Sequence, residues 1–84
     1  MIPDHDGYYV YVIKCRNRSY YTGWTTNLKQ RFYQHAIGKG AKYTRAFAPL
    51  ELFYYEQLTS KVAAQKREYE IKQYSHKQKT ALKQ

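Results

Sequence analysis

Four side chains that can exchange protons or contact anions are concentrated in residues 9–35. Tyr11 and Tyr21 each lie in a short run of β-branched and aromatic residues. Arg31 and His35 are four residues apart in a helical pattern, which makes them neighbours on one helix surface. We expect these four side chains to surround one surface, although a solvated arginine and a partly packed histidine would produce the same spacing.

A carboxylate from much later in the chain is expected to join them. Glu68 follows helical spacing with Ala64 and Ile71, so it belongs to a helix face that is otherwise apolar. A carboxylate beside an apolar stripe costs free energy unless it is paired or coordinates a metal. Glu70, two residues on, points elsewhere and is interpreted as a solvated surface charge.

Three runs of residues have the composition of β-strands, and they cover residues 8–15, 20–25 and 50–58. Both alternating faces of the first run are largely apolar, as expected for a strand that is covered on both sides. The first two runs, joined by a polar turn, predict an antiparallel hairpin. In the third run, Leu50, Leu52 and Tyr54 should alternate with Phe53 and Tyr55.

Helix start and stop signals separate and follow these strands. Asn27 with Gln30 predicts a helix that ends at Gly38 and has an apolar stripe of Leu28, Phe32, Tyr33 and Ala36. Ser60 predicts the start of a second long helix that runs to about Tyr74, and Ser75 opens a short C-terminal helix. The fold class is therefore α/β of the α+β type, with a three-stranded antiparallel sheet flanked by helices. The order is β-β-α-β-α, followed by the short helix.

The segment 38–49 is expected to be a loop or a short helical turn that contacts phosphate. Its glycines expose backbone N–H groups, which bind phosphate oxygens together with basic and hydroxyl side chains. The glycines alone are weak evidence, because they do not have the spacing of a phosphate-binding P-loop. The candidate nucleic-acid-binding residues are Lys39, Lys42, Tyr43 and Arg45.

Length and charge limit the class of protein. Eighty-four residues predict a single domain, 1–84, with its core at about 8–74. Fifteen lysines and arginines against six acidic residues give a net charge of +9, which favours a polyanionic partner over a role in solubility alone. The single Cys15 excludes a disulfide framework and is expected to be buried. With neither a secretory signal nor a membrane-spanning stretch, we expect a cytoplasmic, soluble monomer that does not bind membranes.

The ordered set of segments resembles the GIY-YIG nuclease domain, and in particular its small stand-alone bacterial members. The matching segments are YVYVIKC, SYYTGWTTNLKQR, YQH, GKGAKYTR and KREYEIK, within residues 8–74. The resemblance implies a metal-dependent DNA endonuclease that hydrolyses phosphodiester bonds. Such an enzyme could cleave particular DNA structures during repair or recombination.

Residue roles follow from the same resemblance. Tyr11 corresponds to the tyrosine of the first tripeptide and would position or deprotonate a water, provided that a metal or Arg31 lowers its pKa. Arg31 would bind phosphate oxygens. Glu68 would be the single protein ligand of one Mg²⁺ or Mn²⁺ ion. The remaining members are Tyr21 and His35, which would orient phosphate or shuttle protons, and Gly23, which would allow close backbone approach.

Two other hypotheses remain open. Several active members of the family carry a late asparagine after the glutamate helix, for which this sequence has no counterpart, and we expect no added DNA-binding domain beside the motif. The chain could therefore be a nucleic-acid-binding module with weak catalysis or none. Alternatively, its tyrosine-rich surface could dock a protein partner, which could also be what targets a nuclease.

Overall fold

The sheet has the predicted strands and antiparallel topology. A computed structural model describes residues 2–83. It contains β1 (Tyr8–Cys15), β2 (Tyr20–Thr25) and β3 (Pro49–Leu58), arranged in the order β2-β1-β3 with both pairs antiparallel. The central strand β1 is therefore covered by a neighbour at each edge. The predicted three-stranded antiparallel sheet is confirmed.

In the part of the chain that the structure describes, four helices accompany the sheet: α1 (Leu28–Ala36), α2 (Lys42–Ala46), α3 (Lys61–Lys72) and α4 (His76–Ala81). The element order agrees with the predicted β-β-α-β-α arrangement, and α2 is the short helical turn expected within residues 38–49. Within residues 2–83, no helix is long and apolar enough to cross a membrane.

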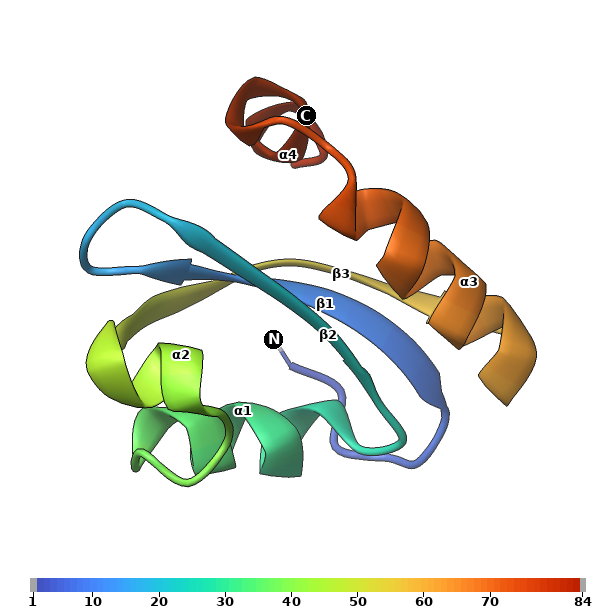
Figure 1. The fold of residues 1–84 in the computed structure, drawn as a ribbon. Coiled ribbons are helices and arrows are strands. Elements are labelled where there is room, and N and C mark those ends of the chain that lie inside the picture. Colours follow the sequence, from blue (N-terminus) through green and yellow to red (C-terminus); the bar gives the residue numbers. More distant parts are fainter. Residues whose placement is uncertain (1, 84) are drawn as a thin grey trace.

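The helices form two layers, one on each face of the sheet. Figure 1 shows α1 and α2 on one side and α3 and α4 on the other. On the α1 side, Tyr9, Tyr11 and Ile13 pack with Leu28 in one core cluster. On the α3 side, Val10 and Val12 belong to a second cluster with residues of β3 and α3. Period-2 alternation along β1 thus separates the side chains of the two cores.

The helix boundaries follow from local capping. The side chain of Asn27 accepts a hydrogen bond from the backbone N–H of Gln30, and Ser60 caps α3 in the same way. Ser75 forms a complete capping box with Gln78 at the start of α4. After α1, Gly38 has a φ of +83°, a conformation that glycine adopts without steric cost. These caps confirm the predicted helix starts.

Two details of the predicted side-chain pattern are wrong. In α1, Tyr33 is 62% exposed and Ala36 is also exposed, whereas His35 is completely buried. The buried side of α1 therefore includes a histidine, which an apolar pattern does not mark. In β3, Tyr54 packs in the same cluster as Phe53 because an irregularity in the β1–β3 register interrupts the alternation.

An ion-paired network joins α3 to β3. Arg67 Nε donates to Glu56 Oε1 at 2.7 Å, and the guanidinium also contacts Glu70 and the hydroxyl of Tyr74. Burial would raise the pKa of Glu56, but hydrogen bonds from Arg67 and Tyr54 lower it overall. The Arg67–Glu56 pair therefore joins α3 to β3.

Candidate active site

Tyr11 and Gly23 face each other across the β1–β2 pair. They are partners in the strand register, and a Cβ atom added to Gly23 would lie 2.5 Å from the Tyr11 hydroxyl oxygen. Real side chains do not approach this closely, so a glycine is required here by the position of the tyrosine. The physical reason for the glycine in the second tripeptide is therefore the phenol of the first.

A chain of hydrogen bonds leads from Tyr11 into the α1–α2 layer. The Tyr11 hydroxyl lies 2.8 Å from His35 Nε2, and His35 Nδ1 lies 2.7 Å from Thr44 Oγ1. Thr44 in turn donates its proton to the carbonyl of Ala41 at 3.3 Å. Because that proton is committed, Thr44 must accept from His35 Nδ1–H, which leaves Nε2 to accept from Tyr11. The geometry assigns one tautomer to His35.

Burial keeps both members of the Tyr11–His35 pair uncharged. Desolvation raises the pKa of Tyr11 to about 12, although Arg31 acts in the opposite direction. Desolvation, together with the charge of Arg31, lowers the pKa of His35 to about 4. Arg31 by itself therefore does not lower the pKa of Tyr11 below its ordinary value. At neutral pH the phenol of Tyr11 therefore keeps its proton, and the imidazole of His35 is neutral.

The lowered pKa of His35 makes stability depend on pH. As pH falls below 6.5, the unfolded chain binds a proton at this histidine before the folded protein does. The stabilisation is fully present above pH 6.5 and is lost progressively as pH falls towards 4. We expect His35 to account for a loss of about 1.5 kcal/mol between pH 6.5 and 5. Denaturant unfolding at several pH values measures this loss.

The control for this pH dependence is His5, which is exposed. His35→Gln should flatten the stability profile between pH 6.5 and 5, whereas His5→Gln should leave it unchanged. If His35→Gln does not fold, an NMR titration of the imidazole in the native protein gives the same answer. An imidazole of His35 that is protonated at pH 6 would contradict the expected result.

Arg31 lies beside this chain of hydrogen bonds and is held by two hydrogen bonds of its own. Its guanidinium donates to Gln34 Oε1 at 3.0 Å and to the carbonyl of Gly40 at 2.9 Å. Gly40 also lies against the imidazole, because a Cβ atom there would overlap His35 Nδ1. Gly40 thus helps to hold both Arg31 and His35 in place. Arg31 is partly exposed and remains available to an anion.

Tyr21 extends the cluster towards the edge of the sheet. Its ring centroid lies 5.1 Å from that of His35 and 6.5 Å from that of Tyr11. The residue is half-buried and belongs to the edge strand β2. The four side chains expected around one surface are therefore brought together by β1, β2 and α1.

Glu68 approaches the cluster from the other layer. Its carboxylate is one of the charges that raise the pKa of Tyr11, so it lies within electrostatic range of the phenol. The side chain is 22% exposed and forms an ion pair with Lys72 at 3.4 Å. Residues 2–83 contain no group of three or more His, Cys, Asp or Glu side chains that could hold a metal ion. A lone, partly exposed carboxylate suits Mg²⁺, which retains several waters and takes further ligands from a bound phosphate.

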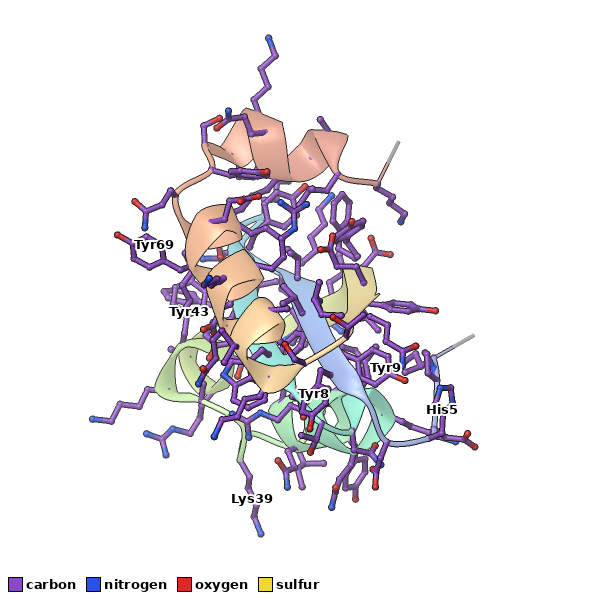
Figure 2. All side chains as sticks on the ribbon, turned by 90° about the vertical axis from the view of Figure 1, so that its right-hand side faces the viewer. His5, Tyr8, Tyr9, Lys39, Tyr43 and Tyr69 are labelled. Carbon is purple, nitrogen blue, oxygen red and sulfur yellow. The ribbon has the colours of Figure 1, made fainter. Side chains whose placement is uncertain are left out.

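The basic residues of the α1–α2 segment lie at the surface. Lys39, Lys42 and Arg45 are exposed, and none of them forms an ion pair within residues 2–83. Figure 2 shows Lys39 extending away from the ribbon. Tyr43 is 37% exposed and its ring stacks on Tyr21. All four predicted nucleic-acid-binding residues are therefore accessible, and one of them touches the tyrosine cluster.

Sequence reasoning missed the residues that support His35 and Arg31. Thr44 contacts His35, Gln34 contacts Arg31, and Gly40 lies against both. The sequence predicts only that the glycines and hydroxyl residues of segment 38–49 contact phosphate, and Thr44 and Gly40 belong to that segment. No spacing rule connects Thr44 with His35, because the chain reverses direction between α1 and α2.

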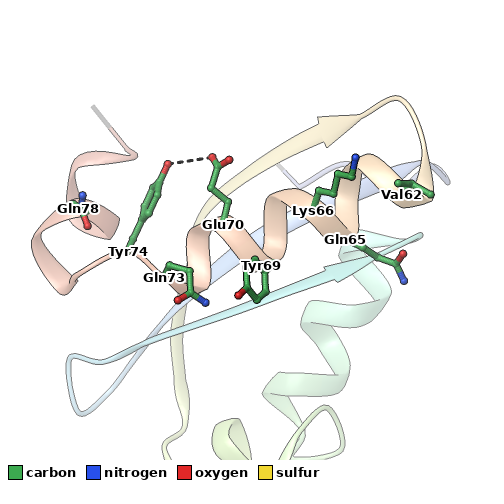
Figure 3. A pocket seen from close by; sticks show the side chains of 8 residues that line it. All are labelled: Val62, Gln65, Lys66, Tyr69, Glu70, Gln73, Tyr74 and Gln78. Carbon is green, nitrogen blue, oxygen red and sulfur yellow. Dashed lines mark hydrogen bonds between the residues drawn. The ribbon is translucent and has the colours of Figure 1, made fainter.

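A groove on the outer side of α3 is separate from this cluster. Figure 3 shows it lined by α3 side chains such as Val62 and Tyr69, with Gln78 contributed by α4. None of the predicted catalytic residues lines the groove. It lies on the helix layer opposite the one that buries Tyr11 and His35.

Comparisons with known proteins indicate the family of this chain. Residues 7–81 match the family model of the GIY-YIG catalytic domain. A UPF0213 protein of Staphylococcus haemolyticus is 51% identical over 75 residues, which cover 89% of this chain and 92% of the relative. A UPF0213 protein of the archaeon Natronomonas pharaonis is 48% identical, with coverages of 98% and 93%. The solution NMR structure of a UPF0213 protein from Bacillus halodurans has a TM-score of 0.56 and 44% identity, covering 89% of this chain and 80% of that one.

Proposed function

Since the chain belongs to the family of GIY-YIG catalytic domains, and within it to the UPF0213 proteins of bacteria and archaea, we propose that it is a metal-dependent endonuclease acting on DNA. The observation that carries the proposal is the Tyr11–His35 hydrogen bond, with Arg31 and Glu68 both close enough to act on the same phenol. The net charge of +9 favours a polyanionic nucleic-acid substrate over a small phosphodiester that carries a single negative charge.

In the proposed mechanism, Arg31 and Tyr21 bind the scissile phosphate. The guanidinium presents a planar fork of donors to two phosphate oxygens, and its permanent charge offsets the charge that grows on them. It would exchange its present hydrogen bonds to Gln34 and Gly40 for these contacts. Tyr21, half-buried at the sheet edge, would donate a hydrogen bond from its hydroxyl and orient the phosphate.

Tyr11 and His35 form the proton path in this proposal. As water attacks phosphorus, the P–O bond to the leaving oxygen breaks and that oxygen takes a proton from solvent. The phenol oxygen of Tyr11 accepts a proton from the attacking water while its own proton passes to His35 Nε2. Thr44 keeps Nε2 free for this step, because it holds the proton on Nδ1. The resulting imidazolium is disfavoured by burial in the free protein. A bound polyanion would offset that cost.

Glu68 would hold a divalent cation beside the phosphate. Such an ion supplies charge neutralisation and Lewis-acid polarisation of the phosphate oxygens when it is bound. The carboxylate would exchange its ion pair with Lys72 for this role, and the exposed lysine can turn to the nucleic acid backbone. Basic residues Lys39, Lys42 and Arg45 would contact flanking phosphates.

The proposal predicts cleavage of DNA that requires a divalent metal. Purified protein incubated with branched, nicked and linear DNA should produce strand breaks in Mg²⁺ or Mn²⁺, because the cation held by Glu68 would neutralise charge on the scissile phosphate. EDTA should stop the reaction, and gel electrophoresis of end-labelled strands measures it. Protein that leaves all three DNA forms intact in both metals would overturn the proposal.

A second candidate function is a nucleic-acid-binding module without useful catalysis. It is favoured by the burial of Tyr11, which is only 2% exposed, and by a pKa of about 12 that keeps its proton in place. Such a module would bind nucleic acid in a salt-sensitive manner even when Arg31 and Glu68 are replaced by alanine. Cleavage that disappears in Glu68→Ala while binding persists distinguishes the nuclease from the module.

A further inference from the structure

A series of aromatic rings leads from the candidate site to the surface. Tyr21 lies 5.1 Å from His35, Tyr43 stacks on Tyr21 at 5.9 Å with planes 28° apart, and Phe47 lies 5.1 Å from Tyr43. The inner end of the series is fully buried, whereas Tyr43 is 37% and Phe47 is 41% exposed. The rings therefore form a continuous path between the hydrogen-bonded pair and solvent.

The two outer rings are not explained by core packing. Neither Tyr43 nor Phe47 belongs to the core cluster on the α1 side, which ends with residues such as Tyr21 and Phe32. Single exposed apolar side chains are common at protein surfaces, whereas adjacent ones that form a patch indicate an interaction site. Because one face of Tyr43 is covered by Tyr21, the ring is held in a fixed plane and presents a prearranged surface.

The charge around these rings identifies the partner. Lys42 precedes Tyr43, Arg45 lies between Tyr43 and Phe47 in α2, and Lys39 lies in the connection before it. All three cations are exposed and without ion pairs within residues 2–83. Aromatic rings beside unpaired cations are the arrangement that binds single-stranded nucleic acid, with bases on the rings and phosphates on the cations.

We infer that Tyr43 and Phe47 form a stacking surface for an unpaired nucleobase next to the candidate active site. The inference rests on the proposed function, because that function places a phosphate of the bound strand at Arg31. The base next to that phosphate would then lie on α2. A base within a duplex is stacked on both faces and cannot reach the rings without leaving its neighbours. The substrate class is therefore nucleic acid with unpaired nucleotides, such as a single strand, a flap or a junction.

Binding measured without cleavage tests the inference. In EDTA, single-stranded oligonucleotides containing 2-aminopurine should bind the protein with quenched fluorescence, and more tightly than a duplex of the same length. Tyr43→Leu and Phe47→Leu should each weaken single-strand binding by about tenfold and leave duplex binding unchanged, since stacking on one ring contributes roughly that factor. Tyr43→Phe should retain the affinity because it retains the ring.

Two control variants separate stacking from charge and from exposed aromatic area. Tyr69→Leu removes a tyrosine that is 69% exposed on α3 and should change neither affinity. Lys42→Gln should weaken binding to single strands and duplexes alike and reduce the salt dependence by about one phosphate contact. The same binding measurements with DNA and with RNA oligonucleotides identify which of the two nucleic acids supplies the unpaired base.

The outcomes distinguish this inference from the proposed function. Equal losses for single strands and duplexes in Tyr43→Leu, or no loss in either, would overturn the stacking surface even if the protein cleaves DNA. Tyr43-dependent binding of single strands by a protein that cleaves nothing would support the stacking surface and overturn the nuclease. Circular dichroism of each variant establishes that it is folded before its affinity is compared.

Discussion

Glu68→Gln is expected to reduce metal-dependent DNA cleavage by about 10²- to 10³-fold, the effect of removing one main source of charge stabilisation from such a site. The change preserves the size of the side chain and its place on α3 but removes the charge that would hold the cation. Since Glu68 is 22% exposed and its ion-pair partner Lys72 is exposed, the fold should tolerate the substitution. Initial rates of strand cleavage at saturating Mg²⁺ measure the effect.

Glu70→Gln is the matched control for Glu68→Gln. Glu70 lies two residues further along α3, has a side chain that is 58% exposed, and is paired with Arg67. Its loss should leave cleavage close to the wild-type rate. Binding of Mn²⁺ in the presence of DNA provides a readout that does not depend on turnover, and it should weaken only in Glu68→Gln. Equal cleavage by the wild type and Glu68→Gln would remove Glu68 from the site.

Gly23→Ala is expected to affect both folding and activity. The added methyl would lie 2.5 Å from the hydroxyl oxygen of Tyr11 and 2.7 Å from its Cζ. Tyr11 is almost completely buried, so either its phenol or the β2 strand must shift against packed neighbours. Such overpacking costs about 1–3 kcal/mol of unfolding free energy. Displacing the phenol from His35 should also lower cleavage by about 10²-fold, the typical effect of a general acid or base.

A double-mutant cycle with Tyr11→Phe isolates the cause. Phenylalanine removes the atom closest to the new methyl, so the destabilisation by Gly23→Ala should be smaller in the Tyr11→Phe background. Denaturant unfolding of the four proteins measures the coupling, and cleavage rates are compared per folded molecule. Gly23→Ala with wild-type stability and wild-type cleavage would show that the close approach of the two strands has no role.

Much of the fold could be predicted because its determinants are local. Runs of β-branched and aromatic residues specified the three strands, and Asn27, Ser60 and Ser75 specified where helices begin. The two apolar faces of β1 correctly predicted a sheet covered on both sides. The register shift in β3 was not predictable, because it depends on how β3 pairs with β1 and not on the composition of either strand.

The members of the candidate site were found from residue types and order, but their physical state was not. The sequence placed Tyr11, Tyr21, Arg31, His35 and Glu68 as candidates, and the structure brings them around one phenol. Their assigned roles remain predictions. The expectation that Arg31 could lower the pKa of Tyr11 failed to include burial, which has the larger effect and raises it.

The sequence by itself determined the strands, the helix starts and the basic surface segment, because each depends on neighbours in the chain. It also identified the residues whose side chains could act in the candidate site. Only the tertiary structure decided that His35 is buried and neutral, that Thr44 selects its tautomer, and that Gly40 makes room for its ring. Those properties arise where α1, α2 and β1 meet. Desolvation and hydrogen-bond geometry at that junction depend on three separate segments at once, and no local pattern encodes them.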